Sequence, residues 1–246
     1  MLHLTVLSPH RDDAAFSLSI GLSRWVKLGT PMKIVNFFTE SEYAPYALPM
    51  QAAVIPALRA REDKQALRSI SPLIRMESLH LLDAPLRLHI GLDAICSTET
   101  ARLQNRDETT WLASQIRRYF SRGVVMAPLG LGNHIDHLVV NHAAVTCATN
   151  QRLAFYEDLP YATWTSECTL RQKVSDLENQ TRTYLIPRII RGRSVVIADK
   201  LRVVSRYKSQ ITREEGKAIS YFARRYHGGE RIWVPKYSKA WMAFTQ

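Results

Sequence analysis

The stretch Ser8-Pro9-His10-Arg11-Asp12-Asp13 decides the fold of this chain. It follows the apolar, β-prone run 2–7, and the spacing of apolar residues over 14–28 predicts a packed helix directly after it. A histidine and two adjacent carboxylates therefore lie where a buried strand ends and a helix begins. Open α/β sheets bind ligands in this place, outside the carboxyl ends of their strands. The stretch thus predicts an α/β fold with a polar site at one sheet edge.

Strand-like and helix-like segments alternate after this stretch. The turn residues Gly29-Thr30-Pro31 precede a second strand, so the first forty residues form a βαβ unit with a right-handed crossover. Strands are predicted over 33–38, 78–82, 123–127 and 153–156, and helices over 57–69, 107–121 and 138–148. We predict a Rossmann-like, mostly parallel sheet flanked by helices.

The pattern changes beyond residue 165. Shorter β-like runs are predicted over 169–174, 184–190 and 194–197, helices over 198–211 and 213–226, and a last strand over 231–234. No stretch rich in Gly, Pro or Ser separates two domains. We therefore expect a single domain over 1–246, with the core sheet and its site in 1–161 and a C-terminal α+β elaboration in 162–246.

Charge is distributed unevenly along the chain. The net charge is +11, yet residues 1–170 hold 16 Lys/Arg and 16 Asp/Glu, so the excess lies in residues 171–246, with 17 and 6. Such a segment serves nucleic acid, an anionic surface or an acidic substrate, or is simply solvated. No nucleic-acid-binding motif accompanies it, so nucleic acid is not the expected partner.

Composition excludes several other classes. No apolar run reaches the ~20 residues of a membrane span, and no signal-peptide pattern is evident at the N-terminus. Cys96, Cys147 and Cys168 are widely spaced and form no CxxC pair, which is typical of reduced thiols. We expect a cytoplasmic location. Nothing in the sequence specifies an oligomeric state.

Polar clusters follow four of the predicted strands. Because parallel strands bring their carboxyl ends to one edge, these clusters can converge. They are His10/Asp12/Asp13, Asp83, His134/Asp136/His137 and Glu157/Asp158.

Histidine nitrogens and carboxylate oxygens suit a divalent metal such as zinc, which in catalytic sites takes three protein ligands and a water. His10 and Asp13 could supply two ligands, and one histidine of His134-x-x-His137 the third. Asp12 would then stand beside the metal-bound water as a general base. The alternative is a surface or helix-capping histidine pair and an Asp-Asp helix cap. Because such polar clusters occur at two strand ends, the interpretation as a metal site is favoured.

The two polar motifs resemble those of the LmbE-like/PIG-L deacetylases. Residues 8–13 resemble the family's Pro-His-Pro-Asp-Asp-Glu signature, and residues 132–137 resemble its Gly-x-His-x-Asp-His motif. Arg59-x-x-Glu62 and Leu82-Asp83 resemble two shorter family patterns, so that the likeness spans residues 4–161. The resemblance implies the LmbE-like fold and zinc-dependent removal of an N-acetyl group.

The resemblance also implies roles for the metal-site residues. Zinc, or another divalent metal such as Fe²⁺, would be bound by His10, Asp13 and His137. Asp12 would be the general base. The two remaining residues of the second motif would assist: His134 would polarise the acyl oxygen or stabilise the oxyanion, and Asp136 would orient a neighbouring imidazole.

Substrate-binding roles follow in the same way for residues outside the metal set. The resemblance implies that Arg59 and Asp83 hold substrate hydroxyls. Arg59 could instead pair with Glu62 or Asp63 on its own helix, and Asp83 could cap the next element.

This chain departs from the family pattern beside the metal motif. Arg11 replaces a proline and either contacts an anionic substrate or lowers the pKa of the carboxylates. Ala14 replaces a glutamate, which removes a carboxylate near the site. The run 157–161 either lines the pocket, with Asp158 binding substrate, or forms an exposed turn.

The sequence therefore predicts a metal-dependent hydrolase that de-N-acetylates an N-acetyl amino sugar, such as an N-acetylglucosamine unit, or its conjugate. Its partner is then a small N-acylated molecule. Two alternatives remain open. One is a metallohydrolase of another N-acylated or lipid-linked anionic metabolite, with the basic segment engaging phosphate. The other is a non-catalytic sugar- or nucleic-acid-binding protein on the same fold.

Overall fold

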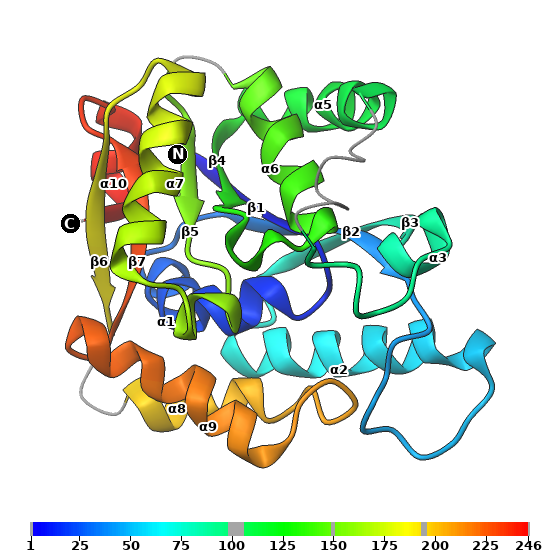
Figure 1. The fold of residues 1–246 in the computed structure, drawn as a ribbon. Coiled ribbons are helices and arrows are strands. Elements are labelled where there is room, and N and C mark those ends of the chain that lie inside the picture. Colours follow the sequence, from blue (N-terminus) through cyan, green and yellow to red (C-terminus); the bar gives the residue numbers. More distant parts are fainter. Residues whose placement is uncertain (1, 98–105, 149–150, 193–195, 246) are drawn as a thin grey trace.

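A central sheet organises the computed structural model, which describes residues 2–97, 106–148, 151–192 and 196–245. Its seven strands have the order β3-β2-β1-β4-β5-β7-β6 (Figure 1). Their bounds are β1 His3–Ser8, β2 Met32–Glu40, β3 Arg75–Leu82, β4 Gly123–Pro128, β5 Leu153–Tyr156, β6 Leu185–Arg191 and β7 Gly229–Pro235. The first five strands run parallel, and β7 is antiparallel to both β5 and β6. The predicted mostly parallel sheet is confirmed.

The direction of winding reverses between β1 and β4. From β1 the chain proceeds outward to β2 and β3, and it then returns to pair β4 with the other side of β1. Every residue of β4 is buried, as in a strand covered on both faces. The loops that follow β1 and β4 meet at this switch point, which is where open α/β sheets hold ligands.

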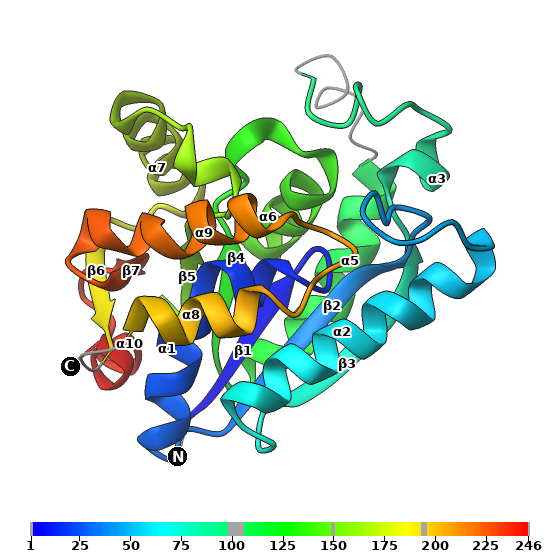
Figure 2. The ribbon, with the colours of Figure 1, turned by 90° about the horizontal axis from the view of Figure 1, so that it is seen from below.

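Helices cover both faces of the sheet (Figures 1 and 2). One layer consists of α1 (Asp13–Lys27), α2 (Ile55–Ile70), α8 (Val196–Val204) and α9 (Arg213–Tyr221), which contact one another. The other consists of α5 (Arg106–Phe120), α6 (Ile135–Cys147) and α7 (Glu167–Thr181). The short elements are α3 (Ala84–Leu88), α10 (Lys239–Thr245), and the 3₁₀ turns η1 (Ala52–Val54), η2 (Leu131–Asn133), η3 (Tyr161–Thr163) and η4 (Phe222–Tyr226).

Two β-like predictions in the C-terminal part are wrong. Residues 169–174 lie in α7, whose buried Leu170, Val174 and Leu177 follow a helical period. The Ser166 hydroxyl accepts a hydrogen bond from the Thr169 N–H and caps this helix. Residues 196–197 begin α8, while 194–195 lie outside the described residues. The predicted helix over 198–211 ends at Val204.

The C-terminal part is joined to α2 by buried hydrogen bonds. The Glu62 carboxylate accepts hydrogen bonds from the backbone N–H and the hydroxyl of Ser209, at 2.9 and 2.6 Å. The neighbouring Asp63 carboxylate accepts one from the Tyr207 hydroxyl at 2.9 Å. Because a buried carboxylate without partners is costly, these contacts fix the segment after α8 against α2.

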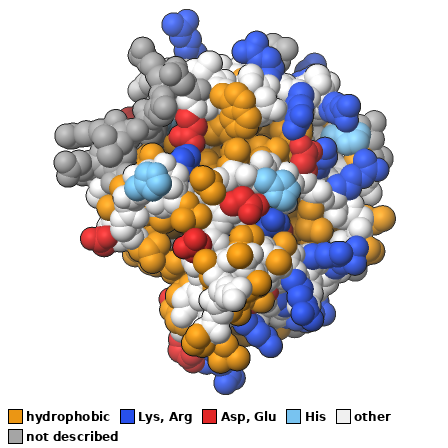
Figure 3. Space-filling model, turned by 90° about the vertical axis from the view of Figure 1, so that its right-hand side faces the viewer, with side chains coloured by type: hydrophobic (Ala, Val, Ile, Leu, Met, Phe, Trp, Pro, Cys, Tyr) orange, Lys and Arg blue, Asp and Glu red, His pale blue; other side chains and the backbone are white. Residues whose placement is uncertain are grey.

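Lys and Arg side chains gather along one margin of the face seen in Figure 3, whereas acidic and hydrophobic side chains occupy its middle.

Among the described residues, no helix is both long enough and apolar enough to cross a membrane.

Candidate metal centre and active site

The loop between β1 and α1 is held by Ser8 and Asp13. The Ser8 hydroxyl accepts a hydrogen bond from the Ala14 N–H at 3.0 Å and donates one to the His10 carbonyl at 2.6 Å. The Asp13 carboxylate accepts one from the His10 N–H at 2.7 Å. Asp12 occupies the N-cap position of α1, but its side chain makes no capping hydrogen bond. The simple helix-cap alternative therefore does not account for Asp12, whose carboxylate is left available.

The loop between β4 and α6 needs glycine at position 132. Gly132 has φ +73°, and a Cβ there would lie 2.3 Å from the ring of Tyr161. After this turn the Nδ1 atom of His134 accepts a hydrogen bond from the Asp136 N–H and caps α6. The helix begins at Ile135, earlier than predicted, so His137 lies in its first turn.

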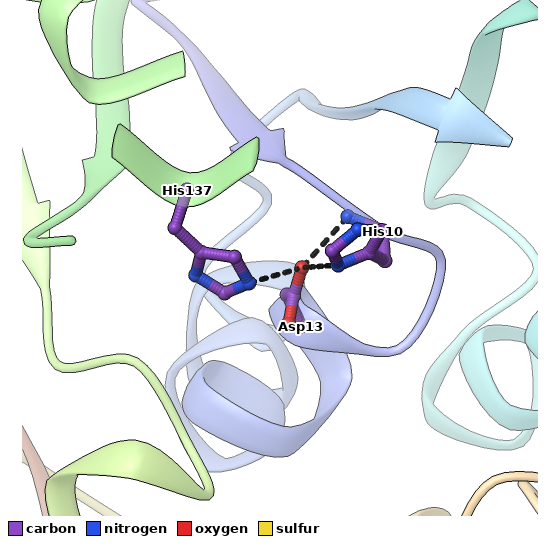
Figure 4. Close-up of side chains that lie close together, drawn as sticks. All are labelled: His10, Asp13 and His137. Atoms are coloured by element: carbon purple, nitrogen blue, oxygen red, sulfur yellow. Dashed lines mark hydrogen bonds and ion pairs between the residues drawn. The ribbon is translucent and has the colours of Figure 1, made fainter. Parts of the chain in front are cut away.

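Three candidate metal donors from these two loops converge (Figure 4). The Nδ1 atom of His10 and the Nε2 atom of His137 lie 3.4 and 3.3 Å from the same Asp13 oxygen, Oδ2. All three ligand atoms lie within 4.8 Å of one another. His137 Nε2 is buried and makes no hydrogen bond, which is unusual for a polar atom in a protein interior. This nitrogen, together with the His10 nitrogen and the Asp13 oxygen, forms a donor set that fits a divalent metal ion.

Carboxylates hold the far nitrogen of both histidines. Asp158 Oδ1 accepts a hydrogen bond from His137 Nδ1 at 2.6 Å, while its Oδ2 accepts the N–H groups of Gly130 and Leu131. Asp136 Oδ2 lies 2.9 Å from His10 Nε2. Each carboxylate thereby directs the other ring nitrogen toward Asp13, as carboxylates beside metal-bound histidines do.

A second group of possible donors consists of His10, His134 and Asp136. Asp136 is already engaged, because it also accepts hydrogen bonds from the Ala84 N–H at 3.0 Å and from Arg87 at 2.8 Å. The Nδ1 atom of His134 is occupied as the helix cap. The first group is therefore the better metal site, and Asp136 lies where it orients an imidazole.

The carboxylates set the charge of the imidazoles. Burial disfavours a charged His10, but its hydrogen bonds to Asp13 and Asp136 outweigh burial and raise the pKa of His10 to about 9. The pKa of His137 is raised well above its usual range, because Asp13 and Asp158 outweigh the effect of burial. Burial, followed by the proximity of His10, lowers the pKa of His134 to about 3. His134 is thus neutral at pH 7, with a proton on Nε2 since Nδ1 accepts a hydrogen bond.

The remaining predicted residues lie around the same centre. Arg59 donates a hydrogen bond to the Ser41 hydroxyl at 2.9 Å, and its other terminal nitrogen lies 3.6 Å from Asp12. Its partners are therefore not the carboxylates of its own helix. Burial raises the pKa of Asp12 above its ordinary value. Asp83 caps α3 through the Leu86 N–H and also lines the cavity beside the metal centre.

Two predicted substrate-binding residues point elsewhere. Arg11 is buried and donates a hydrogen bond to the Ser78 hydroxyl on β3, and it does not line the cavity. Asp158 is completely buried, and its two oxygens are taken by His137 and by backbone N–H groups. Asp158 therefore does not line the cavity, whereas Pro160 and Tyr161 of the same run do. The alternative of an exposed turn does not hold, because Glu157 is also buried.

The cavity at the centre has a volume of about 360 Å³, which is in the range of small-molecule sites. Part of its wall comes from the C-terminal segment, which sequence reasoning did not place near the metal. Tyr161 belongs to the run 157–161, for which lining of the pocket was one of the two predictions. The lining residues that we did not predict include Leu92, Ile95, Trp164, Gln210, Ile211, Glu215, Ala218 and Ile219.

Solved structures share this fold. A deacetylase of the teicoplanin biosynthesis pathway superposes with a TM-score of 0.69 at 21% identity, covering 96% of this chain and 100% of that one. The antimicrobial A40926 pseudoaglycone deacetylase also superposes with a TM-score of 0.69, at 20% identity, covering 95% and 96% of the two chains. At such identities these likenesses establish the fold.

Sequence comparison identifies the family as well as the fold. The chain is 30% identical over 235 residues to the 2'-N-acetylparomamine deacetylase of Streptomyces fradiae, an alignment that covers 93% of this chain and 80% of that protein. The profile of the GlcNAc-PI de-N-acetylase family matches residues 5–148, a stretch that contains all three candidate metal donors. This chain belongs to the PIG-L family.

Proposed function

We propose that this protein is a metal-dependent N-deacetylase that hydrolyses the acetamide of an amino sugar or amino sugar conjugate. The observation that carries the proposal is the orphaned Nε2 atom of His137, which faces the Asp13 oxygen beside His10. A related protein, 30% identical, is a 2'-N-acetylparomamine deacetylase. Zinc suits two imidazoles and a carboxylate, and Fe²⁺ is the alternative.

The residues around the metal have complementary roles. A bound zinc would polarise the acyl oxygen and lower the pKa of water at this site. Asp12 accepts a proton from the attacking water and later delivers it to the leaving nitrogen. The C–N bond breaks, and acetate and a free amine are the products. The Arg59 guanidinium, 3.6 Å from Asp12, orients that carboxylate.

His134 donates a hydrogen bond to the acyl oxygen in this proposal. Because its Nδ1 atom accepts the Asp136 N–H, its neutral imidazole presents Nε2–H to the cavity that it lines. This donor stabilises the negative charge that develops on the acyl oxygen. Arg59 and Asp83 line the cavity and bind substrate hydroxyls.

The whole chain 1–246 works as a single domain in this proposal. The support is the mixed origin of the cavity wall, which combines residues near the metal motifs with residues of α9. The free thiols of Cys96, Cys147 and Cys168 support a reducing, cytoplasmic location.

An amine-release assay tests the proposed function. Purified protein is incubated with a panel of N-acetylated amino sugars and conjugates, before and after chelation, and then with added Zn²⁺ or Fe²⁺. We expect amine release that chelation abolishes and one of the metals restores. Protein that contains stoichiometric metal but releases no amine from any member of the panel would contradict the proposal.

A further inference from the structure

The cavity extends outward from the metal centre along two aromatic rings. The Tyr161 ring packs edge-to-face on His137, with ring centroids 5.3 Å apart. Trp164 packs in the same manner on Tyr161, with centroids 5.8 Å apart and an angle of 86° between the rings. Both aromatic residues line the cavity. Trp164 thus lies two ring contacts away from the candidate metal ligand His137.

Trp164 is unusual because it is large, apolar and 66% exposed. The backbone at this residue is held in place, since the main-chain N–H of Trp164 donates to the Tyr161 carbonyl, which also accepts a hydrogen bond from the Thr165 hydroxyl at 2.9 Å. An indole held at a cavity mouth with most of its surface open offers a flat platform. Tryptophan is also the best of the aromatic side chains at attracting a cation to its face.

The α9 wall of the same cavity contains a carboxylate with spare hydrogen-bonding capacity. One oxygen of Glu215 accepts the N–H and the hydroxyl of Thr212, which completes the cap of α9. The other oxygen accepts only the Tyr46 hydroxyl among the described side chains, at 3.4 Å. That distance is long for a hydrogen bond between oxygens, so this oxygen can accept a stronger donor.

The charge of the cavity is opposite to that of the protein. The chain carries a net charge of +11, yet among the described residues that line the cavity only Arg59 is a lysine or arginine. The carboxylates that line it are Asp12, Asp13, Asp83 and Glu215. A divalent ion at Asp13 would leave the Glu215 side of the cavity negative. This balance disfavours an anionic or phosphorylated substrate and favours a cationic one.

We propose that the outer part of this cavity binds the second ring of an amino sugar conjugate, with the ring on the Trp164 indole and a ring ammonium group at Glu215. The proposal rests on the proposed function, because it specifies the substrate class of the same site. Trp164 and Glu215 lie outside the stretch 5–148 that matches the family profile. They are therefore specificity-determining residues of this chain rather than part of the metal machinery.

Three acetylated probes test this subsite. They are N-acetylglucosamine, its disaccharide with a neutral glucose ring, and its disaccharide with a glucosamine ring that carries an ammonium group. The readout is the ratio of kcat/KM for each disaccharide to that for the monosaccharide. We expect Trp164→Ala to lower this ratio about tenfold for both disaccharides, through KM. Glu215→Gln should lower it about threefold to fivefold, for the glucosamine disaccharide alone.

Matched controls are available elsewhere in the chain. Glu214→Gln removes the carboxylate of the residue before Glu215. Glu214 pairs with Lys217 and does not line the cavity. Trp111→Ala removes another exposed indole, 48% exposed, on α5. Both controls should keep the wild-type ratios. Glutamine retains the capping box of α9, so Glu215→Gln should fold normally.

The subsite can fail while the proposed function stands. Unchanged ratios in Trp164→Ala and Glu215→Gln, in a wild type that releases amine, would overturn the subsite alone. An equal loss with the glucose and glucosamine disaccharides in Glu215→Gln would overturn the ammonium assignment. Calorimetric titration with the fully deacetylated glucosamine disaccharide tests binding without turnover. We expect Trp164→Ala to weaken that binding about tenfold, and unchanged affinity would refute the platform.

Discussion

The Nδ1 atom of His137 donates a 2.6 Å hydrogen bond to Asp158 and so joins the first turn of α6 to the end of β5. This bond directs Nε2, the atom with no other partner, toward Asp13. Asp158→Asn should weaken metal binding about 10- to 100-fold, because an amide cannot accept at both of its terminal atoms. Chelator competition measures the affinity. The exposed Asp176→Asn on α7 is the control, and an unchanged metal affinity in Asp158→Asn would contradict the role.

Asp12→Asn should separate catalysis from metal binding. The Asp12 carboxylate lines the cavity but is not one of the three converging donors. We expect kcat to fall by about 10²- to 10⁴-fold, as for loss of a general base, with the metal content unchanged. Steady-state kinetics and elemental analysis of the same preparation provide both values. Full activity in this variant would remove Asp12 from the mechanism.

His134 and His137 should differ in what their loss removes. In His134→Gln the metal should stay, and kcat should fall by about 10²- to 10³-fold because a donor to the acyl oxygen is lost. In His137→Gln the metal itself should be lost. Elemental analysis after dialysis distinguishes the two variants. Loss of metal in His134→Gln would instead assign the metal to His10, His134 and Asp136.

Much of the site was predictable because its residues lie directly after strands of an alternating strand–helix pattern. His10, Asp13 and His137 each follow a buried parallel strand, and the switch point between β1 and β4 brings such strand ends together. The periodicity of apolar residues therefore predicted which polar clusters converge, whereas the choice of His137 over His134 as a metal ligand came from the resemblance to the LmbE-like/PIG-L motifs. The hydrogen-bonding partner of each imidazole depends on side-chain direction, which periodicity does not specify.

The remaining parts depend on contacts between distant segments. Arg11 was expected either to contact the substrate or to lower the pKa of the neighbouring carboxylates, but it donates a hydrogen bond to the half-buried hydroxyl of Ser78 on β3. The α9 wall of the cavity is positioned by hydrogen bonds such as that between Glu62 and Ser209, which are 147 residues apart. The segment 169–174 was predicted as β-like, but its two apolar residues, Leu170 and Val174, are four apart and lie on one face of the capped helix α7.

Stability should depend on pH through Asp63. Burial raises the pKa of this carboxyl to about 7, against ~3.9 in an unfolded chain. Between these values the folded chain holds the extra proton, so the free energy of unfolding should fall as pH rises, by about 1.4 kcal/mol per pH unit. Asp63→Asn should remove this slope in urea titrations. The exposed Asp199→Asn should keep it, and equal slopes in the wild type and Asp63→Asn would contradict the assignment.

Gly132 and Gly29 form a matched pair for the loop before the second motif. Both have φ +73°, but a Cβ at Gly29 would meet no atom within 4 Å, whereas at Gly132 it would meet the Tyr161 ring. Gly29→Ala should therefore cost only the backbone strain, about 1–2 kcal/mol. Gly132→Ala should cost more and should also lower activity by displacing Tyr161. Thermal unfolding compares the two, and equal losses would show that the ring yields freely.

Two different parts of the chain supply the metal donors and part of the cavity wall. The candidate metal donors lie within residues 10–137, whereas Glu215 and Ile219, which also line the cavity, come from α9. Substitutions in α9 can therefore change which amino sugar conjugate is bound without disturbing the residues that hydrolyse the acetamide. Grafting the α9 surface between two members of the family should transfer substrate preference while leaving the bond that is cleaved unchanged.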